Sequence, residues 1–191
     1  MKIRRTVEGI TEDTGFRVGD IISFELEDGE KAEAMAVKQE GEDMIFCHVD
    51  CLIDESMMNS NNSNKGGYEK SYLRKRLQRG VLPRYPEEMR SRMVPFENGD
   101  LLRIPTEKEI FGENMYGEEE PETTCQWEPM KLRRNRIAFQ GHNGSWEWYW
   151  LQNRDVSSGA NFAGVGTYGG ANAGGASDSC GVRPVFKIRN L

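Results

Sequence analysis

The chain has 191 residues, of which 37% are hydrophobic and 29% are charged, and its formal net charge is −6. Its four Trp, six Tyr and eight Phe need a core, so the composition indicates one folded domain, or one domain with a small N-terminal annex. The acidic balance argues against a general nucleic-acid partner, and no apolar run reaches the roughly 18 residues of a membrane span.

The start of the chain contains basic residues but no apolar stretch of the kind that a secretory signal requires. We therefore expect synthesis in the cytoplasm. A phage structural protein would also begin there and leave by lysis, so the place of action stays open between the cytoplasm and a virion.

The N-terminal part of the chain has the pattern of an antiparallel β-meander with one face in solvent. The expected strands span residues 21–26, 32–37 and 44–52. We place residues 1–58 in an N-terminal unit packed on a main domain of residues 59–191.

The third expected strand contains Cys47-His48-Val49-Asp50-Cys51, which supplies ligand types that zinc accepts. Four residues of strand span about 13 Å, so Cys47 and Cys51 cannot share a metal or form a disulfide there. We interpret them as buried structural thiols. The other cysteines, Cys125 and Cys180, are also expected to be free, and we predict no metal and no cofactor.

The middle of the chain alternates loops with short helices. Expected elements are a polar loop at 59–67, helices at 68–79 and 86–93, strands at 101–104 and 137–140, and an exposed acidic loop at 112–129. Gly80 is expected to end the first helix, and Thr106 with Glu109 forms a capping box that starts another. The basic face of the first helix, and Arg133, Arg134 and Arg136, are expected to pair with acidic neighbours rather than bind phosphate.

The C-terminal part begins with Trp146-Glu147-Trp148-Tyr149-Trp150-Leu151, where strand alternation puts three Trp on one face and predicts a core position. Residues 157–181 then contain eight Gly and five Ala. This stretch is either a flexible connection or a shallow binding surface with aromatic tips at Phe162 and Tyr168. On the second interpretation the ligand-binding residues are Asn153, Asn161, Phe162, Tyr168, Asn172 and Asp178.

No set of catalytic residues is apparent. The chain has only two His, at positions 48 and 142, so a Ser/His/Asp or Cys/His arrangement has few candidate bases. The Gly-rich stretch ends in a strand expected at 182–188, which does not fit a phosphate-binding loop. The sequence therefore predicts a protein that is not an enzyme.

Residues 44–188 resemble a known family. Tyr149 to Arg154, followed by the Gly-rich stretch and by Gly181-Val182-Arg183-Pro184-Val185-Phe186, is similar to an uncharacterised domain of gut Firmicutes and their phages. That domain reads Tyr-Trp-Leu-Arg-Ser-Pro and ends in Gly-Val-Arg-Pro-Ala. The ending also resembles the Gly-Phe-Arg of formylglycine-generating-enzyme-like folds and of the variable receptor-binding proteins of diversity-generating retroelements. The resemblance implies an α+β, C-type-lectin-like fold with Arg183 structural in the closing strand.

Two departures from these families bear on function. Gln152-Asn153-Arg154 replaces Arg-Ser-Pro, and Cys180 stands alone where the oxidase branch has a cysteine pair for copper. Our first hypothesis is therefore a non-enzymatic ligand- or receptor-binding module, in a phage-associated setting, with a protein or a glycan as its ligand. The alternatives are a metal-dependent oxidase, which requires Cys125 to meet Cys180, and a virion structural protein that forms a homo-oligomer.

Overall fold

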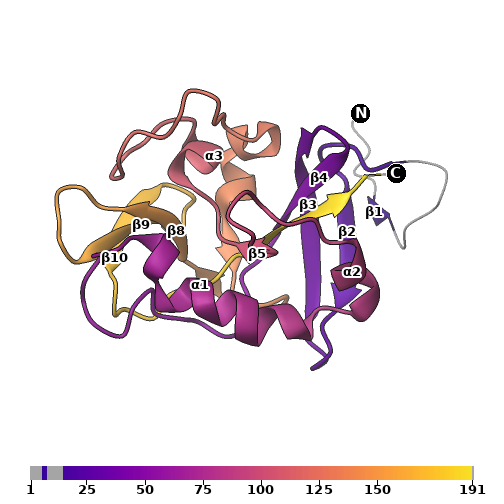
Figure 1. Cartoon of the computed structure of the whole chain (residues 1–191), viewed down its shortest axis with the longest axis horizontal. Coiled ribbons are helices and arrows are strands. Elements are labelled where there is room, and N and C mark those ends of the chain that lie inside the picture. Colours follow the sequence, from indigo (N-terminus) through magenta and orange to yellow (C-terminus); the bar gives the residue numbers. More distant parts are fainter. Residues whose placement is uncertain (1–5, 8–14, 191) are drawn as a thin grey trace.

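The computed structural model describes residues 6–7 and 15–190, which form a mixed α+β structure of mainly antiparallel sheets and short helices (Figure 1). The larger sheet has the strand order β1-β2-β3-β4-β11-β5. Its strands are β1 (Thr6–Val7), β2 (Ile21–Glu25), β3 (Lys31–Glu40), β4 (Asp43–His48), β5 (Leu102–Arg103) and β11 (Val185–Arg189). All its pairings are antiparallel except β1 with β2. The α+β class is thus confirmed.

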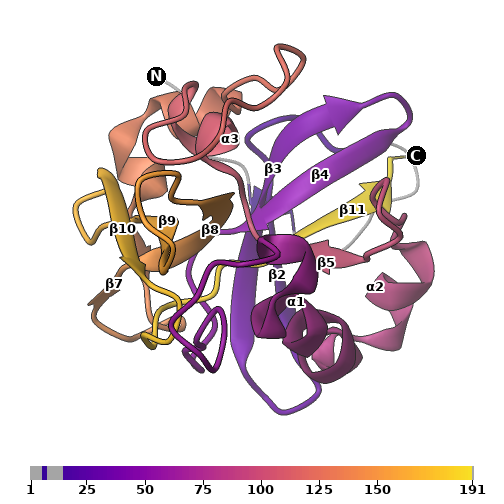
Figure 2. The same cartoon turned by 60° about the vertical axis from the view of Figure 1, so that its left-hand side comes forward.

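A smaller sheet contains much of the C-terminal third of the chain, in the order β10-β9-β8. Its strands are β8 (Tyr149–Arg154), β9 (Asn161–Val165) and β10 (Ala171–Gly175), and the short pair β6 (Ala138–Phe139) and β7 (Trp146–Glu147) lies before them in sequence. Figures 1 and 2 show β8, β9 and β10 on the opposite side of the molecule from β2, β3 and β4. The Gly-rich stretch therefore includes two paired strands, and its interpretation as a flexible connection is wrong.

The helical elements are short. They are η1 (Tyr68–Lys70), α1 (Tyr72–Arg76), η2 (Leu77–Val81), η3 (Leu82–Arg84), α2 (Glu87–Arg92), α3 (Glu107–Phe111), η4 (Glu128–Lys131) and η5 (Arg133–Arg136). Gly80 does not end the first helical run, because the π-helical turn η2 continues through it. Gly112 does end α3, with a left-handed φ of 85°. The capping box of Thr106 and Glu109 is confirmed.

Both faces of the central strands are buried, so the expectation of one solvent-exposed face is wrong. Ala34 and Ala36 of β3 belong to one core cluster. Met35 and Val37, which alternate with them, belong to the other. Later parts of the chain cover each face: α1 packs on the first cluster, and η4 and β8 pack on the second.

The larger sheet continues across the domain boundary that we place after residue 58. The closing strand β11 pairs with β4 on one side and with β5 on the other. The meander and the end of the chain therefore share one sheet. Residues 1–5 and 8–14, which contain most of the basic start, lie outside the described residues. Within the described residues, no helix has the length and apolar character needed to cross a membrane.

Arg183 is buried just before β11, rather than within it as the resemblance implies. Its Nε donates to the carbonyl oxygen of His48 at 2.6 Å. The other two nitrogens donate to the Tyr149 hydroxyl at 2.9 Å and to the Asn135 carbonyl at 3.0 Å. Arg183 therefore joins β4, β8 and η5, and its partners are all uncharged.

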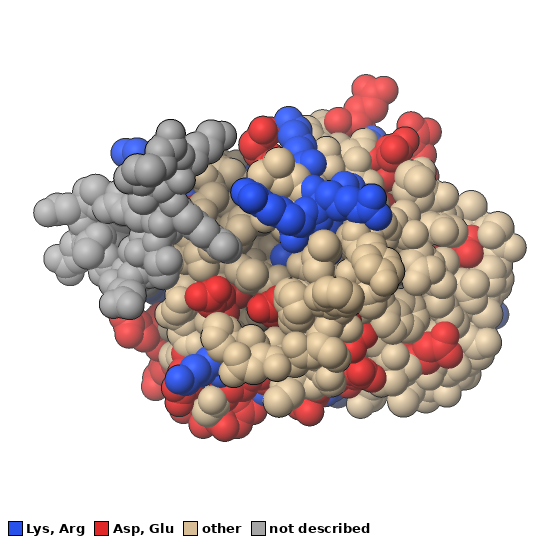
Figure 3. Space-filling view, turned by 180° about the vertical axis from the view of Figure 1, so that it is seen from behind, with Lys and Arg blue, Asp and Glu red and all other residues tan. Residues whose placement is uncertain are grey.

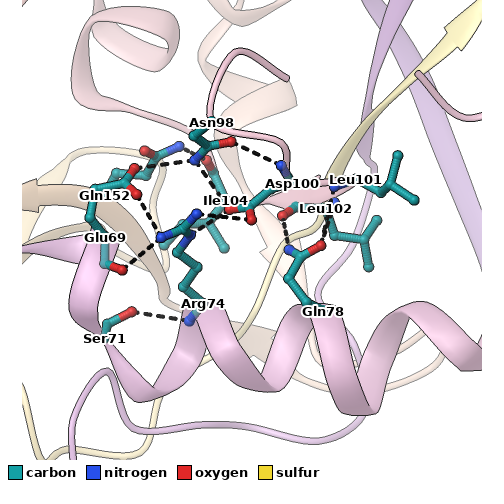
Figure 4. A network of polar contacts seen from close by, with 10 residues as sticks. All are labelled: Glu69, Ser71, Arg74, Gln78, Asn98, Asp100, Leu101, Leu102, Ile104 and Gln152. Atoms are coloured by element: carbon teal, nitrogen blue, oxygen red, sulfur yellow. Dashed lines mark hydrogen bonds and ion pairs between the residues drawn. The ribbon is translucent and has the colours of Figure 1, made fainter. Parts of the chain in front are cut away.

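Two residues of the basic face of α1, Arg74 and Arg76, pair with acidic neighbours as the sequence predicts. Lys70, Lys75 and Arg79 form no ion pair with a described residue. Figure 4 shows Arg74 between Asp100 and Glu69, with a distance of 2.6 Å from Nε to the Asp100 carboxylate. Asn98 donates to both carboxylates, and Gln78 bonds the backbone at β5. This side of α1 is thus part of the internal polar network of the fold.

The polar loop at 59–67 is a structural element rather than a linker. Asn64 is buried, and its Nδ2 lies 2.6–3.1 Å from the carbonyl oxygens of Asp155, Ser158 and Asn161. These contacts hold the turn between β8 and β9 against the loop. The pattern of Asn, Ser and Gly indicates the loop correctly but gives no sign of this contact.

Candidate functional site

A groove of about 580 Å³ lies along β10 and the turn before it. Three separate parts of the chain contribute to it: η5, the junction of β7 with β8, and the β9–β10 hairpin. The lining residues with larger side chains are Arg133, Trp148, Thr167, Tyr168, Asn172 and Asp178. Aromatic rings and small residues form most of the walls, and charged side chains lie toward the ends of β10.

Three tryptophans lead from the core to the rim of the groove. Trp150 is fully buried and donates through Nε1 to the carbonyl of Ser56 at 2.8 Å. Trp148 is half-buried, with its ring centroid 5.4 Å from that of Trp150. Trp146 is 58% exposed, and its ring lies 6.1 Å from the ring of Tyr168, which is 68% exposed. The expectation that this segment is all core therefore holds for Trp150 and fails for Trp146.

Small residues are required in β10 because an aromatic ring packs against the strand. A Cβ on Gly174 would lie 2.6 Å from Cη2 of Trp148, closer than any side chain tolerates. The preceding turn needs Gly169, whose φ is 71°. A Cβ there would also lie 2.9 Å from the carbonyl oxygen of Arg133. The Gly content of this segment therefore reflects close packing and a tight turn, which leave a shallow floor of backbone and indole.

The strand β10 is the edge of its sheet, and side chains cap part of that edge. The N–H of Ala173 donates to Oδ1 of Asn172 at 2.9 Å, and the N–H of Gly175 donates to Oδ2 of Asp178 at 2.9 Å. Open edges attract further strands, and capped donors reduce that tendency. Asn172 and Asp178 thus stabilise the edge as well as line the groove.

The structure brings together three of the six predicted ligand-binding residues: Tyr168, Asn172 and Asp178 line the one groove. Phe162 does not belong with them, and its prediction as an exposed aromatic tip is wrong. It is fully buried in the first core cluster, because the alternation of β9 turns this position inward.

Asn153 and Asn161 do not line the groove, and their role in ligand binding stays a prediction. The side chain of Asn153 accepts from the N–H of Glu107 at 2.8 Å and donates to the Glu120 carboxylate at 2.9 Å. It therefore ties the start of α3 to the acidic loop. Asn161 begins β9, and its carbonyl oxygen accepts from Asn64.

The short helix η5 presents positive charge beside the groove. It contains Arg133, Arg134 and Arg136. The expectation that these arginines pair with the acidic loop is wrong: Glu118 pairs with Arg154, and the Glu120 carboxylate accepts from the side-chain amide of Asn114 in its own loop. Figure 3 shows Lys and Arg side chains gathered near the middle of the face turned away in Figure 1.

Burial holds His48 and the thiols of Cys47 and Cys51 in their neutral forms. Burial, with Arg183 nearby, lowers the pKa of His48 to about 3, and the Nε2 of this His lies 2.6 Å from the Tyr85 hydroxyl. Burial raises the pKa of the Cys47 and Cys51 thiols, which makes them unreactive. Both are buried, as the sequence predicts.

The remaining cysteines differ in environment. Cys125 is exposed, whereas Cys180 is buried and its thiol donates to the carbonyl of Trp148 at 3.2 Å. All four cysteines are free. Among residues 6–7 and 15–190, no group of three or more His, Cys, Asp or Glu side chains is arranged to hold a metal ion. The groove, rather than a cysteine cluster, is therefore the site with recognisable chemistry.

Sequence reasoning missed Trp148 and Arg133 as groove residues, and Trp146 as the exposed neighbour of Tyr168. A signal for the tryptophans was present, because their alternation places them on one face with the buried Trp150. It did not show that this face reaches solvent at one end. The place of Arg133 beside Tyr168 depends on a contact between residues 35 apart in sequence, for which the chain gives no local sign. In comparisons with known proteins, no family model, curated protein or solved structure matches the chain.

Proposed function

We propose that this protein is a non-enzymatic binding module that holds its ligand in the groove along β10. The observation that carries the proposal is the exposed aromatic pair, Trp146 and Tyr168, at the rim of that groove. Trp and Tyr give binding surfaces large, rigid contact areas at little entropic cost. The volume of about 580 Å³ is also within the usual range of small-ligand sites.

The shape and chemistry of the groove favour a glycan over a folded protein partner. Its length follows β10, five residues that span roughly 17 Å. A stable protein interface needs about 800 Å² from each partner, more than such a short groove offers. Flat aromatic rings beside amide and hydroxyl groups suit sugars, which have an apolar ring face and a polar edge.

The proposal is tested with a glycan array and a protein array. Each array is probed with the intact protein and with two single variants. We expect Tyr168→Ala and Trp146→Ala each to reduce the affinity for the array members that bind by about tenfold or more, since truncation of an aromatic anchor costs about 2 kcal/mol. Tyr72→Ala is the matched control, because Tyr72 is an exposed tyrosine on α1 that does not line the groove. If both groove variants bind every ligand as the unaltered protein does, the proposal is wrong.

The C-type-lectin-like fold stays a prediction that rests on the resemblance, as does the phage-associated setting. Synthesis in the cytoplasm and action in a virion also stay predictions. The burial of Val182, Arg183 and Phe186 in the closing motif supports the first. Light scattering addresses the virion alternative, which closed rings or trimers would favour. Metal analysis of the purified protein addresses the oxidase alternative, which requires bound copper.

A further inference from the structure

One end of the groove carries a positive charge that a neutral ligand would leave unused. Arg133 lines the groove, and its Nε donates to the carbonyl oxygen of Tyr168 at 2.8 Å. That bond fixes the guanidinium at the backbone of Tyr168. The two terminal nitrogens have no hydrogen-bond partner among the described residues.

Arg134 and Arg136 belong to the same short helix as Arg133 but do not line the groove. The guanidinium of Arg136 lies over the ring of Phe111, 5.4 Å from its centroid. Among the described residues, Arg74, Arg84 and Arg103 pair with carboxylates, whereas Arg133, like Arg79 and Arg90, forms no ion pair. The positive charge at the groove is therefore that of Arg133, and no described carboxylate neutralises it by direct contact.

The acidic residue of the groove does not cancel this charge. Asp178 follows the far end of β10, and its carboxylate accepts from the N–H of Gly175. The five residues of β10 separate the two ends by roughly 17 Å. At physiological ionic strength the screening length is about 8 Å, so Asp178 hardly affects an anion beside Arg133.

We propose that the groove binds an acidic saccharide, with its carboxylate on the guanidinium of Arg133 and a sugar ring against Tyr168 and Trp146. This inference rests on the proposed function and names the ligand class. The two free nitrogens of Arg133 present a planar fork that matches both oxygens of a carboxylate. Tyr168 lines the same groove, and its backbone carbonyl holds the Arg133 side chain.

An acidic peptide is the competing anionic ligand, and the edge of β10 argues against it. A peptide that adds as a strand needs free backbone donors along the edge. The N–H groups of Ala173 and Gly175 are already occupied by Asn172 and Asp178. A saccharide can instead use these side chains without displacing them.

A panel of paired ligands on the unaltered protein gives the first test. Oligosaccharides that carry uronic or sialic acids are compared with their own methyl esters, which keep the sugar faces but remove the charge. Sulfated sugars and acidic peptides are included as separate arms. We expect at least one acid to bind about tenfold more tightly than its ester, with the difference shrinking at high salt.

Variants locate the carboxylate contact. Arg133→Gln should remove the preference for the acid over the ester, and Arg133→Lys should restore part of it because the charge remains. Arg79→Gln, an equal change of charge at an exposed position outside the groove, should leave the preference intact. Loss of the Nε bond in Arg133→Gln could move Tyr168, but the comparison of acid with ester does not depend on any variant.

The outcomes separate this inference from the proposed function. Equal binding of acids and esters, weakened by Tyr168→Ala, would overturn the acidic ligand and keep the groove. A preference for the acid that stays unchanged in both Tyr168→Ala and Arg133→Gln would overturn both proposals. Binding confined to sulfated sugars or to peptides, or binding to no member of the panel, would overturn the acidic saccharide.

Discussion

Replacement of Arg183 by Met gives the sharpest test of how the two sheets are held together. The buried guanidinium donates to three acceptors that belong to β4, β8 and η5: the carbonyl of His48, the hydroxyl of Tyr149 and the carbonyl of Asn135. Met fills a similar space but donates no hydrogen bond. The variant therefore leaves three polar groups without their partner in a site that water does not reach easily.

The expected loss of stability follows mainly from the two carbonyl groups, because the Tyr149 hydroxyl keeps its bond to the carbonyl of Arg136. Each buried, unsatisfied group costs about 1–3 kcal/mol. Removal of a buried charge also returns part of its desolvation penalty, so the total should be less than the sum. We expect the free energy of unfolding to fall by about 3–4 kcal/mol. For a chain of this length that lowers the melting temperature by roughly 6–16 °C.

Urea unfolding followed by tryptophan fluorescence, with thermal unfolding by circular dichroism, measures the change. The control is Arg189→Met, which removes an exposed arginine paired with Glu42 and Asp43 and should cost less than about 1 kcal/mol. Arg183→Lys should fall between the two, because one ammonium cannot reach all three acceptors. A loss for Arg183→Met no larger than that of the control would refute the idea that this residue joins the sheets.

Three further predictions concern groups away from the groove. The folded pKa of His48, about 3, lies below its unfolded value of about 6.5, so the unfolded chain takes up the proton first and stability falls as pH drops through this interval. His48→Gln should remove up to about 1.4 kcal/mol per pH unit of that slope in urea unfolding between pH 7 and pH 4, and an unchanged slope would contradict it. Asn64→Ala should lower the free energy of unfolding by about 1–3 kcal/mol, whereas Asn143→Ala, at an exposed turn, should change it little. A thiol reagent should modify one cysteine rapidly in the native protein, the exposed Cys125, and rapid reaction of a second would show that the buried thiols are accessible.

The parts of the fold that the sequence predicts are those set by local rules. The capping box of Thr106 and Glu109 acts over three residues. The alternation of tryptophans runs over six residues, although the structure divides them between β7 and β8. The meander follows from turns at Gly29 and Gly41, both of which have positive φ. These features depend on neighbouring residues, so one chain is enough to find them.

The parts that sequence reasoning missed depend on which distant segments meet. The second face of the larger sheet is buried because η4 and β8 cover it. The uninterrupted apolar run from Ala34 to Val37 is a local sign of burial on both faces, but it does not show which segments provide the cover. The residue type of Phe162 suits either an exposed aromatic tip or a core position. Only the packing of β9 shows that it points inward. Glu118 could have paired with the arginines of η5, but it pairs with Arg154 instead.

The fold and the groove are connected through η5. The guanidinium of Arg183 holds the carbonyl of Asn135, and the Tyr149 hydroxyl donates to the carbonyl of Arg136 at 3.0 Å. Two of the four carbonyl groups in this short helix are thus fixed from the buried side. Because the helix cannot turn without breaking those bonds, Arg133 on its exposed side keeps its place beside Tyr168. The buried arginine of the closing motif therefore stabilises the core and also preorganises the positive end of the groove, which reduces the entropy that a ligand must lose on binding.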